Sequence, residues 1–284
     1  MKNSEYGIEM KVIVLIENTA CSADLKGQHG LAFYIENDGI KILFDCGADE
    51  LFLENAGKLG VDISAVDYLF ISHGHYDHGG GLEAFLKENN KAKIIINKYA
   101  FDDYYGKVLF LKKYIGLDKT LRDNERIVFT EKNTELGNNM FVLTNITGDK
   151  YRSSKSKLLK RTNGKLISDD FRHEQCLIIN DVLFAGCSHN GIVNIFDNAK
   201  EIKEIKGIKY IFGGFHLFNP TTKQTEDRIL IENIANELKH ENIKIYTGHC
   251  TGTNAYKILK SILGDKIEEL STGKEYYLKQ KKNP

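Results

Sequence analysis

Short apolar runs alternate with amphipathic segments along most of the chain, a pattern typical of sheets covered by helices. Runs bounded by turn residues predict strands at 10–16, 30–36, 40–44, 66–71, 92–97, 175–179, 182–185, 209–212 and 243–246. Apolar residues at helical spacing predict helices over 49–59, 82–87, 192–206 and 225–238. Asn-Asp dipeptides at 37–38 and 180–181 mark two hairpins. The predicted elements indicate two sheets packed face to face with helices outside.

The interval 98–165 is the least regular part of the chain, with short strand-like pieces at 126–129 and 140–143. Its last part, 150–165, is rich in lysine and arginine and contains no acidic residue. Two interpretations stay open: a solvated mobile loop, or a lid whose cations meet an anionic substrate such as a phosphate. Because no change in composition divides the chain, we expect a single domain over 1–284 with an insertion or lid at about 98–165.

Composition narrows the class of protein. The chain has 284 residues, of which 42% are hydrophobic, and its 39 basic residues balance 39 acidic ones. This balance gives no reason to expect a nucleic-acid partner, and no apolar run reaches transmembrane length. The first residues lack an apolar signal core, and the five cysteines include no Cys-x-x-Cys pair. We therefore expect a cytoplasmic protein with a small-molecule substrate, no membrane partner and no disulfide framework.

The residues that can carry chemistry gather directly after the predicted strand 66–71. The sequence there is His-Gly-His-Tyr-Asp-His at 73–78, followed by three glycines. Imidazole and carboxylate groups suit Zn²⁺, Fe²⁺ or Mn²⁺. In an extended segment His73 and His75 point the same way and can share one ion, while Asp77 and His78 can serve a second. The motif predicts a metal site at the end of a strand, where ligands collect in α/β sheets.

Three later strands each end in a histidine on a glycine-bearing turn, namely His189, His216 and His249. Their regular placement predicts that they converge with the 73–78 turn on one rim of the sheets. His29 lies in a polar loop, where a histidine is usually solvated, although it could also face the site.

The phrase His-x-His-x-Asp-His after a buried strand resembles the metallo-β-lactamase superfamily of metal-dependent hydrolases. Gly-Cys-Ser-His at 186–189, Gly-Gly-Phe-His at 213–216 and His-Cys-Thr-Gly at 249–252 narrow the resemblance to one branch. Members of that branch are labelled as dihydropterin ribofuranosylaminobenzene phosphate synthases or as metal-dependent hydrolases. The resemblance implies an α/β fold of the αββα four-layer type, with two mixed sheets inside and helices outside.

The resemblance also implies ligands. Carried over residue by residue, the first metal would be held by His73 and His75, and the second by Asp77, His78 and His249. As third ligand of the first metal we favour His189, with His173 as the alternative.

Two more positions are assigned by the resemblance. Cys187 occupies the place of the superfamily's usual bridging aspartate, where it is either a thiolate ligand or a small buried residue. Asp45, in a strand-Asp-x-Gly phrase, would orient ligands through hydrogen bonds.

The implied cofactors are two divalent ions, with Zn²⁺ expected and Mn²⁺ or Fe²⁺ as alternatives. The implied activity is hydrolysis of a small phosphorylated or ester substrate by a metal-activated hydroxide. Asp77 can accept a proton, and His216 would bind the substrate or protonate the leaving oxygen, or else brace a ligand. Three alternatives remain: a synthase that couples a pterin to a ribofuranosylaminobenzene phosphate, an iron-dependent redox protein, and a non-catalytic metal-binding protein.

Overall fold

The computed structural model describes residues 9–108, 111–154 and 158–279, and two seven-stranded sheets dominate this part of the chain. The first sheet has the order β20-β1-β2-β3-β4-β5-β8. Its strands are β1 (Glu9–Ile16), β2 (Ala32–Asn37), β3 (Ile40–Phe44), β4 (Tyr68–Ile71), β5 (Lys93–Asn97), β8 (Ile127–Thr130) and β20 (Glu275–Lys279).

The second sheet has the order β19-β18-β15-β14-β13-β10-β9. Its strands are β9 (Thr134–Gly137), β10 (Met140–Leu143), β13 (Cys176–Ile179), β14 (Val182–Phe184), β15 (Tyr210–Gly213), β18 (Lys244–Thr247) and β19 (Ile267–Glu269). Both sheets are mixed: β3, β4 and β5 run parallel in the first, and β14, β15 and β18 run parallel in the second. Parallel neighbours bring their carboxyl ends to one edge, so the turns that follow them lie together.

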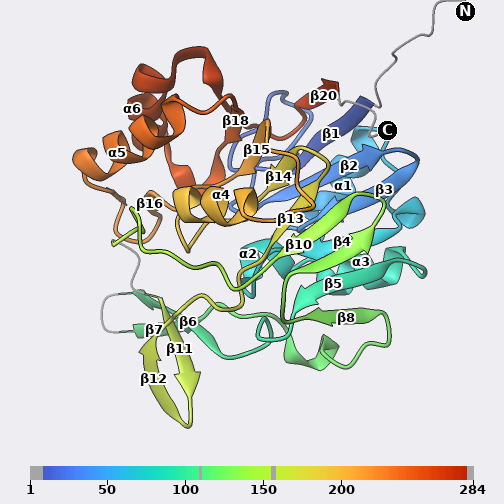
Figure 1. Cartoon of the computed structure of the whole chain (residues 1–284). Coiled ribbons are helices and arrows are strands. Elements are labelled where there is room, and N and C mark those ends of the chain that lie inside the picture. The colour runs from blue at the N-terminus through green and yellow to red at the C-terminus, as the bar shows by residue number, and fades with distance from the viewer. Residues whose placement is uncertain (1–8, 109–110, 155–157, 280–284) are drawn as a thin grey trace, which may run out of the picture.

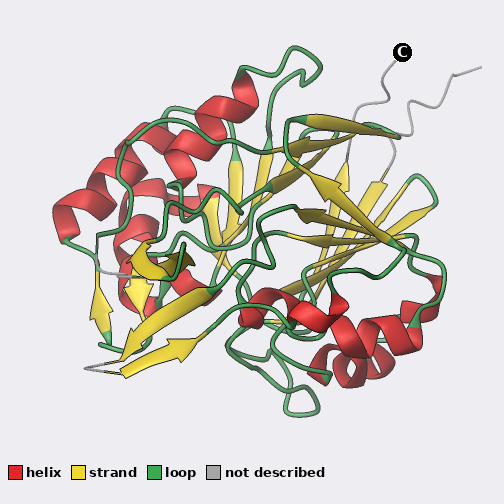
Figure 2. Cartoon of the chain, turned by 90° about the horizontal axis from the view of Figure 1, so that it is seen from below, coloured by secondary structure: helices red, strands yellow, loops and turns green. Residues whose placement is uncertain are grey.

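The two sheets pack face to face, with helices on both outer faces (Figures 1 and 2). Aromatic rings fill the space between the sheets: Phe44 of the first lies 5.9 Å from Phe184 of the second, between ring centroids. The helices are α1 (Leu51–Lys58), α2 (Tyr76–Gly79), α3 (Leu82–Glu88), α4 (Ile192–Lys200), α5 (Arg228–Lys239) and α6 (Thr253–Leu263). In the part of the chain that the structure describes, 3₁₀ turns cover Ile63–Ala65, Lys119–Leu121, His249–Thr251 and Gly264–Lys266. The predicted αββα sandwich is confirmed.

Outside the sandwich lies a four-stranded sheet of order β12-β11-β6-β7, at the bottom of Figure 1. It consists of β6 (Tyr104–Val108), β7 (Leu111–Tyr114), β11 (Leu159–Thr162) and β12 (Lys165–Ser168). The interval 98–165 is thus divided, because β8, β9 and β10 extend the two large sheets. A short hairpin, β16 (Phe218–Asn219) with β17 (Gln224–Thr225), completes the secondary structure of the described residues.

Two predicted helices differ in length from the observed ones. The helix expected over 192–206 ends at Lys200, although Ile202 and Ile208 stay buried in the core beneath it. Apolar residues three positions apart can also be buried by consecutive non-helical turns. Their spacing therefore made the predicted helix longer than the observed one. The helix expected from 225 begins at Arg228, because Gln224 and Thr225 pair in β17. No helix among the described residues combines the length and apolarity that a membrane span requires.

Candidate metal centre

The turns after β3, β4, β14, β15 and β18 meet at one edge of the sandwich, and each carries candidate site residues. Four residues of these turns adopt the left-handed conformation: Asp45 (φ 56°), Ser188 (φ 56°), His216 (φ 52°) and His249 (φ 49°). Such a conformation costs a non-glycine residue about 1–2 kcal/mol and persists where the surrounding contacts hold it. Left-handed residues also occur in turns elsewhere, such as Asn138 and Asn180, but these four lie among or beside the candidate ligands.

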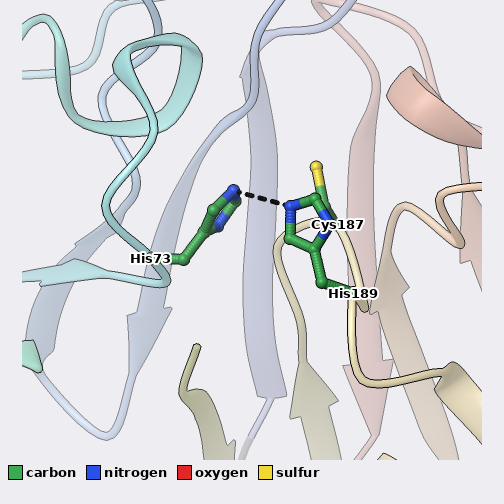
Figure 3. A group of neighbouring side chains, drawn as sticks. All are labelled: His73, Cys187 and His189. Atoms are coloured by element: carbon green, nitrogen blue, oxygen red, sulfur yellow. Dashed lines mark hydrogen bonds between the residues drawn. The ribbon is translucent and has the colours of Figure 1, made fainter. Parts of the chain in front are cut away.

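His73 and His189 face each other from opposite sheets (Figure 3). Their Nε2 atoms lie 3.3 Å apart. Nitrogen ligands at about 2.0–2.1 Å from a tetrahedral Zn²⁺ are separated by about 3.3 Å, so this spacing suits two ligands of one ion. The Cys187 sulfur joins them, with the three ligating atoms within 4.8 Å of one another.

A second group forms beside the first. Nε2 of His78 lies 3.2 Å from Nε2 of His249, and Oδ2 of Asp77 lies 3.8 and 3.4 Å from these two nitrogens. The structure therefore brings together the three residues predicted to hold a second ion. Cys187 also belongs here, because its Sγ lies 3.1 Å from Nε2 of His78.

Cys187 is the point at which the two groups meet. It follows β14, is 3% exposed, and is a member of both trios, His73-Cys187-His189 and His78-Cys187-His249. Burial raises the pKa of its thiol, and the neighbouring Cys250 raises it further. A bound cation reverses this balance, because a coordinating thiol loses its proton. The structure thus places the Cys187 sulfur within 4.8 Å of the ligating atoms of both groups.

His75 and His173 are placed differently. Nε2 of His75 is buried and has no hydrogen-bond partner among the described residues, and its ring centroid lies 4.6 Å from that of His73. In His173, Nδ1 accepts a hydrogen bond from the Gly74 N–H (2.9 Å), and Nε2 contacts Oδ2 of Asp169 (3.1 Å). The ligating atoms of His75, Asp169 and His173 lie within 4.8 Å of one another, whereas His189 belongs to the group of His73 and Cys187.

Asp45 orients two of the histidines, as the resemblance implied. Its Oδ2 lies 2.6 Å from Nδ1 of His78, and its Oδ1 accepts the Ser72 N–H at 2.7 Å. The Ser72 hydroxyl bonds Oδ2 of Asp45 and lies 2.9 Å from Nδ1 of His73. Fixing the Nδ1 atoms in this way directs both Nε2 atoms into the centre.

Two buried glutamates hold the turns of the second sheet. Glu174 accepts the backbone N–H groups of His189 (2.6 Å) and Asn190 (2.8 Å). Glu17, directly after β1, accepts the N–H of His249 at 2.5 Å and that of Thr19 at 2.7 Å. Sequence reasoning missed both glutamates, and the available signal was a single acid at the border of an apolar strand.

The electrostatics of the centre favour metal-binding protonation states. Burial lowers the pKa of His75 to about 3 and lowers the pKa values of His73 and His189 well below the usual range. For Asp77, burial alone would raise the pKa, but His78, His249 and His29 outweigh it and hold the carboxyl group ionised. Neutral imidazoles and an ionised carboxylate are the forms that ligate metals.

His78 is the exception among these rings. Burial would lower its pKa, but the carboxylates of Asp45 and Asp77 outweigh burial and raise it. The second group therefore attracts positive charge, which a cation can supply in place of a proton. The donor set, the unpartnered nitrogens and the ligand-like spacings fit divalent ions.

His216 and His29 border the centre. His216 is 8% exposed, neither ring nitrogen has a partner among the described residues, and its ring centroid lies 4.1 Å from that of His189. His29 faces the site, with Nε2 at 3.3 Å from Oδ2 of Asp77. Both line a cavity of about 550 Å³ that opens over the centre between the β6–β7 hairpin and the turn before β17.

The basic stretch 150–165 does not supply cations to this cavity from its described residues. Lys150 pairs with Asp197 at 2.9 Å, and Lys160 pairs with Asp170 at 2.6 Å. Leu158 does line the cavity. Residues 155–157 lie outside the described part of the chain, so the predicted role of their lysines stays a prediction.

Known proteins resemble the chain along most of its length. Residues 25–150 match the sequence profile of the metallo-beta-lactamase superfamily. The chain is 31% identical over 290 residues to a Methanocaldococcus jannaschii protein named 7,8-dihydropterin-6-methyl-4-(beta-D-ribofuranosyl)-aminobenzene-5'-phosphate synthase, a match covering 93% of this chain and 95% of that one. It is 30% identical over 256 residues to an uncharacterized protein of the same organism, covering 88% and 93% of the two chains.

A solved structure agrees with these relatives. The crystal structure of Tm1679, described as a metal-dependent hydrolase of the beta-lactamase superfamily, superposes with a TM-score of 0.79 at 31% identity, covering 95% of this chain and 100% of that one. The 31% identity extends over nearly the whole of both chains, and the two proteins share the same sandwich fold. The chain therefore belongs to the metallo-β-lactamase superfamily.

Proposed function

We propose that the protein is a dinuclear metal-dependent hydrolase that acts on a small phosphorylated or ester substrate in the cytoplasm. One observation carries the proposal: two pairs of imidazole nitrogens at 3.3 and 3.2 Å meet at the Cys187 sulfur beneath a substrate-sized cavity. All five cysteines are free, which suits a reducing compartment.

The residues divide into two ligand sets. His73, His75 and His189 would hold the first ion, Asp77, His78 and His249 the second, and Cys187 would be shared between them. Zn²⁺ suits this mixture of nitrogen, oxygen and sulfur donors. When bound, two such ions acidify water and polarise the group under attack.

The chain's own groups would complete the chemistry. His216 lines the cavity, lies beside the sulfurs of Cys187 and Cys250, and can donate a hydrogen bond or a proton to the leaving oxygen. Asp77 stays ionised beside three imidazoles and so keeps its carboxylate available to a cation or a proton. Burial of the whole set strengthens each electrostatic interaction in it.

Elemental analysis of the purified protein tests the proposal first. We expect near two zinc or manganese ions per chain, and we expect His75→Ala to lose at least one. Protein with two ions should then hydrolyse members of a panel of phosphoesters and lactones. Absence of metal under every loading condition would overturn the proposal and leave a non-catalytic scaffold.

A second candidate function rests on the relative named as a synthase, which matches this chain at 31% identity over 93% of its length. In that case the cavity would bind a pterin diphosphate and a ribofuranosylaminobenzene phosphate and join them through a new C–N bond, releasing diphosphate. Product analysis by mass spectrometry separates the candidates. A coupled product would favour the synthase, whereas unaltered amine together with phosphoester hydrolysis would favour the hydrolase.

A further inference from the structure

The small sheet beside the cavity is strongly basic, although the whole chain has no net charge. Its four strands contain no aspartate or glutamate. The cations on these strands are Lys107, Lys112, Lys113, Lys160, Arg161 and Lys165. A basic module next to a metal cavity points to a ligand that carries negative charge away from the metals.

Two cations of this module line the cavity, Lys107 and Lys113. The one that also contacts the metal motif, through the ring of Tyr76, is Lys113. In the β6–β7 register it lies opposite Gly106, and both residues line the cavity. Its neighbour Lys112 lies opposite Lys107 in the register and does not itself line the cavity. The glycine partner leaves the space beside Lys113 free of a cross-strand side chain.

The hairpin is tied directly to the metal motif. The Tyr76 N–H donates to the carbonyl oxygen of Ile115, just after β7, at 2.8 Å. Nζ of Lys113 lies 5.4 Å from the centroid of the Tyr76 ring, and Tyr76 precedes the proposed ligand Asp77. Lys113 is therefore held at a fixed side of the centre, within reach of a molecule in the same cavity.

The charge of Lys113 is not neutralised locally. Among the described residues, no carboxylate oxygen lies within 4.0 Å of its Nζ, whereas Lys160 pairs with Asp170. Asp77, which shares the cavity lining, is engaged by His29, His78 and His249. Lys113 is exposed, so its ammonium group is available to an anionic group of a ligand in the cavity.

We propose that Lys113, stacked over Tyr76, forms a subsite for a second anionic group, a phosphate or carboxylate, of the substrate whose reacting group lies at the metal centre. The inference rests on the proposed function and deepens it, because it defines the substrate as a small molecule with two anionic ends. Ile115, Leu158 and Pro220 line the same cavity and suit an apolar body between those ends.

Calorimetric titration with α,ω-alkane bisphosphates of increasing length, and with alkyl monophosphates of the same lengths, tests the subsite. On the metal-loaded protein we expect the bisphosphate of matching length to bind about fivefold more tightly than its monophosphate, a preference that weakens as salt is added. Lys113→Ala should abolish the preference and Lys113→Arg should retain it. Lys112→Ala is the matched control, because it removes the same charge from a neighbouring residue that does not line the cavity, and it should leave the preference unchanged.

The outcomes separate the subsite from the activity. Equal loss in Lys112→Ala and Lys113→Ala, or no bisphosphate preference at any length, would overturn the subsite. Phosphoester hydrolysis that persists in either case would leave the proposed hydrolase standing. A preference that depends on Lys113 without any turnover would support the subsite and count against the hydrolase.

Discussion

The two halves of the sandwich contribute to the centre in different ways. The first sheet supplies four candidate ligands from one continuous turn, residues 73–78 after β4. The second sheet supplies Cys187, His189 and His249 from two separate strand ends, β14 and β18. Nitrogen pairs of nearly equal spacing, 3.3 and 3.2 Å, nevertheless join the two halves.

The difference lies in what fixes each side chain. Within 73–78 the covalent chain itself keeps the ligands close, and Asp45 and Ser72 adjust their rings. The turns of the second sheet depend on carboxylates outside them: Glu174 lies 15 residues before His189, and Glu17 lies 232 residues before His249. The contiguous motif takes the orientation of its rings from Asp45 and Ser72, whereas the dispersed set also needs its turns anchored.

Substitution of one ligand from each half tests the comparison most severely. We expect His73→Ala and His189→Ala to lose the same ion and to reduce hydrolysis by about 10³-fold, since a metal ion supplies several kcal/mol of transition-state stabilisation. Metal content and kcat/KM are the measurements. His240→Ala, on the exposed end of α5, is the control and should match wild type. A large loss for one ligand only would show that the two are not partners.

The carboxylate anchors should have smaller effects, confined to the second half. Glu174→Gln replaces a carboxylate that accepts two backbone N–H groups, and Glu17→Gln does the same at the His249 turn. Loss of such orienting contacts costs about 10–100-fold in metal affinity. Competition with a chromophoric chelator measures it. Glu54→Gln, at an exposed position on α1, should bind metal as wild type does, and an equal loss there would contradict the anchor role.

Close packing of the motif predicts a stability effect in the first half. A Cβ at Gly74 would lie 2.2 Å from the Ala100 carbonyl oxygen, so Gly74→Ala should destabilise the fold by about 1–3 kcal/mol. Gly57→Ala, in α1 with open space around the added carbon, should stabilise by about 0.5–1 kcal/mol. Urea unfolding of both variants measures the contrast. A neutral Gly74→Ala would mean that the motif turn tolerates movement.

The smallest expected effect is a pH dependence of stability that involves Asp169. Asp169 contacts His173, which accepts a hydrogen bond from the Gly74 N–H of the motif. Burial alone would raise the pKa of Asp169, but hydrogen bonding and attraction to His173 outweigh it and hold the pKa below its usual 3.8. The ionised carboxylate therefore stabilises the fold above about pH 4, and this contribution disappears as the pH falls through the lowered pKa.

In chelator-treated protein, Asp169→Asn should lower the free energy of unfolding by about 1–3 kcal/mol at neutral pH. The gap to wild type should narrow in acid below the usual carboxyl pKa. Denaturant unfolding across this range measures the gap. A gap that is constant down to the lowest pH would show that Asp169 acts by packing rather than by charge.

The alternation of apolar runs and turns was enough to predict most strands and the αββα sandwich, because burial against two faces imposes a pattern that each segment carries by itself. The 73–78 motif could also be recognised from sequence, because its candidate ligands are neighbours in the chain. The end of α4 could not be predicted, because Ile202 and Ile208 continue the helical spacing of apolar residues although they lie outside the helix.

Only the tertiary structure shows which residues from distant segments of the chain lie together. Sequence left His189 and His173 as alternatives, and the fold places His189 in a group with His73 and Cys187 and His173 in a group with His75 and Asp169. It also placed Cys187 between the two ligand groups and Lys113 on the cavity face of its hairpin. Local patterns record which face of a strand is buried, but the partner across a sheet edge follows from packing of the whole chain, which no single segment encodes.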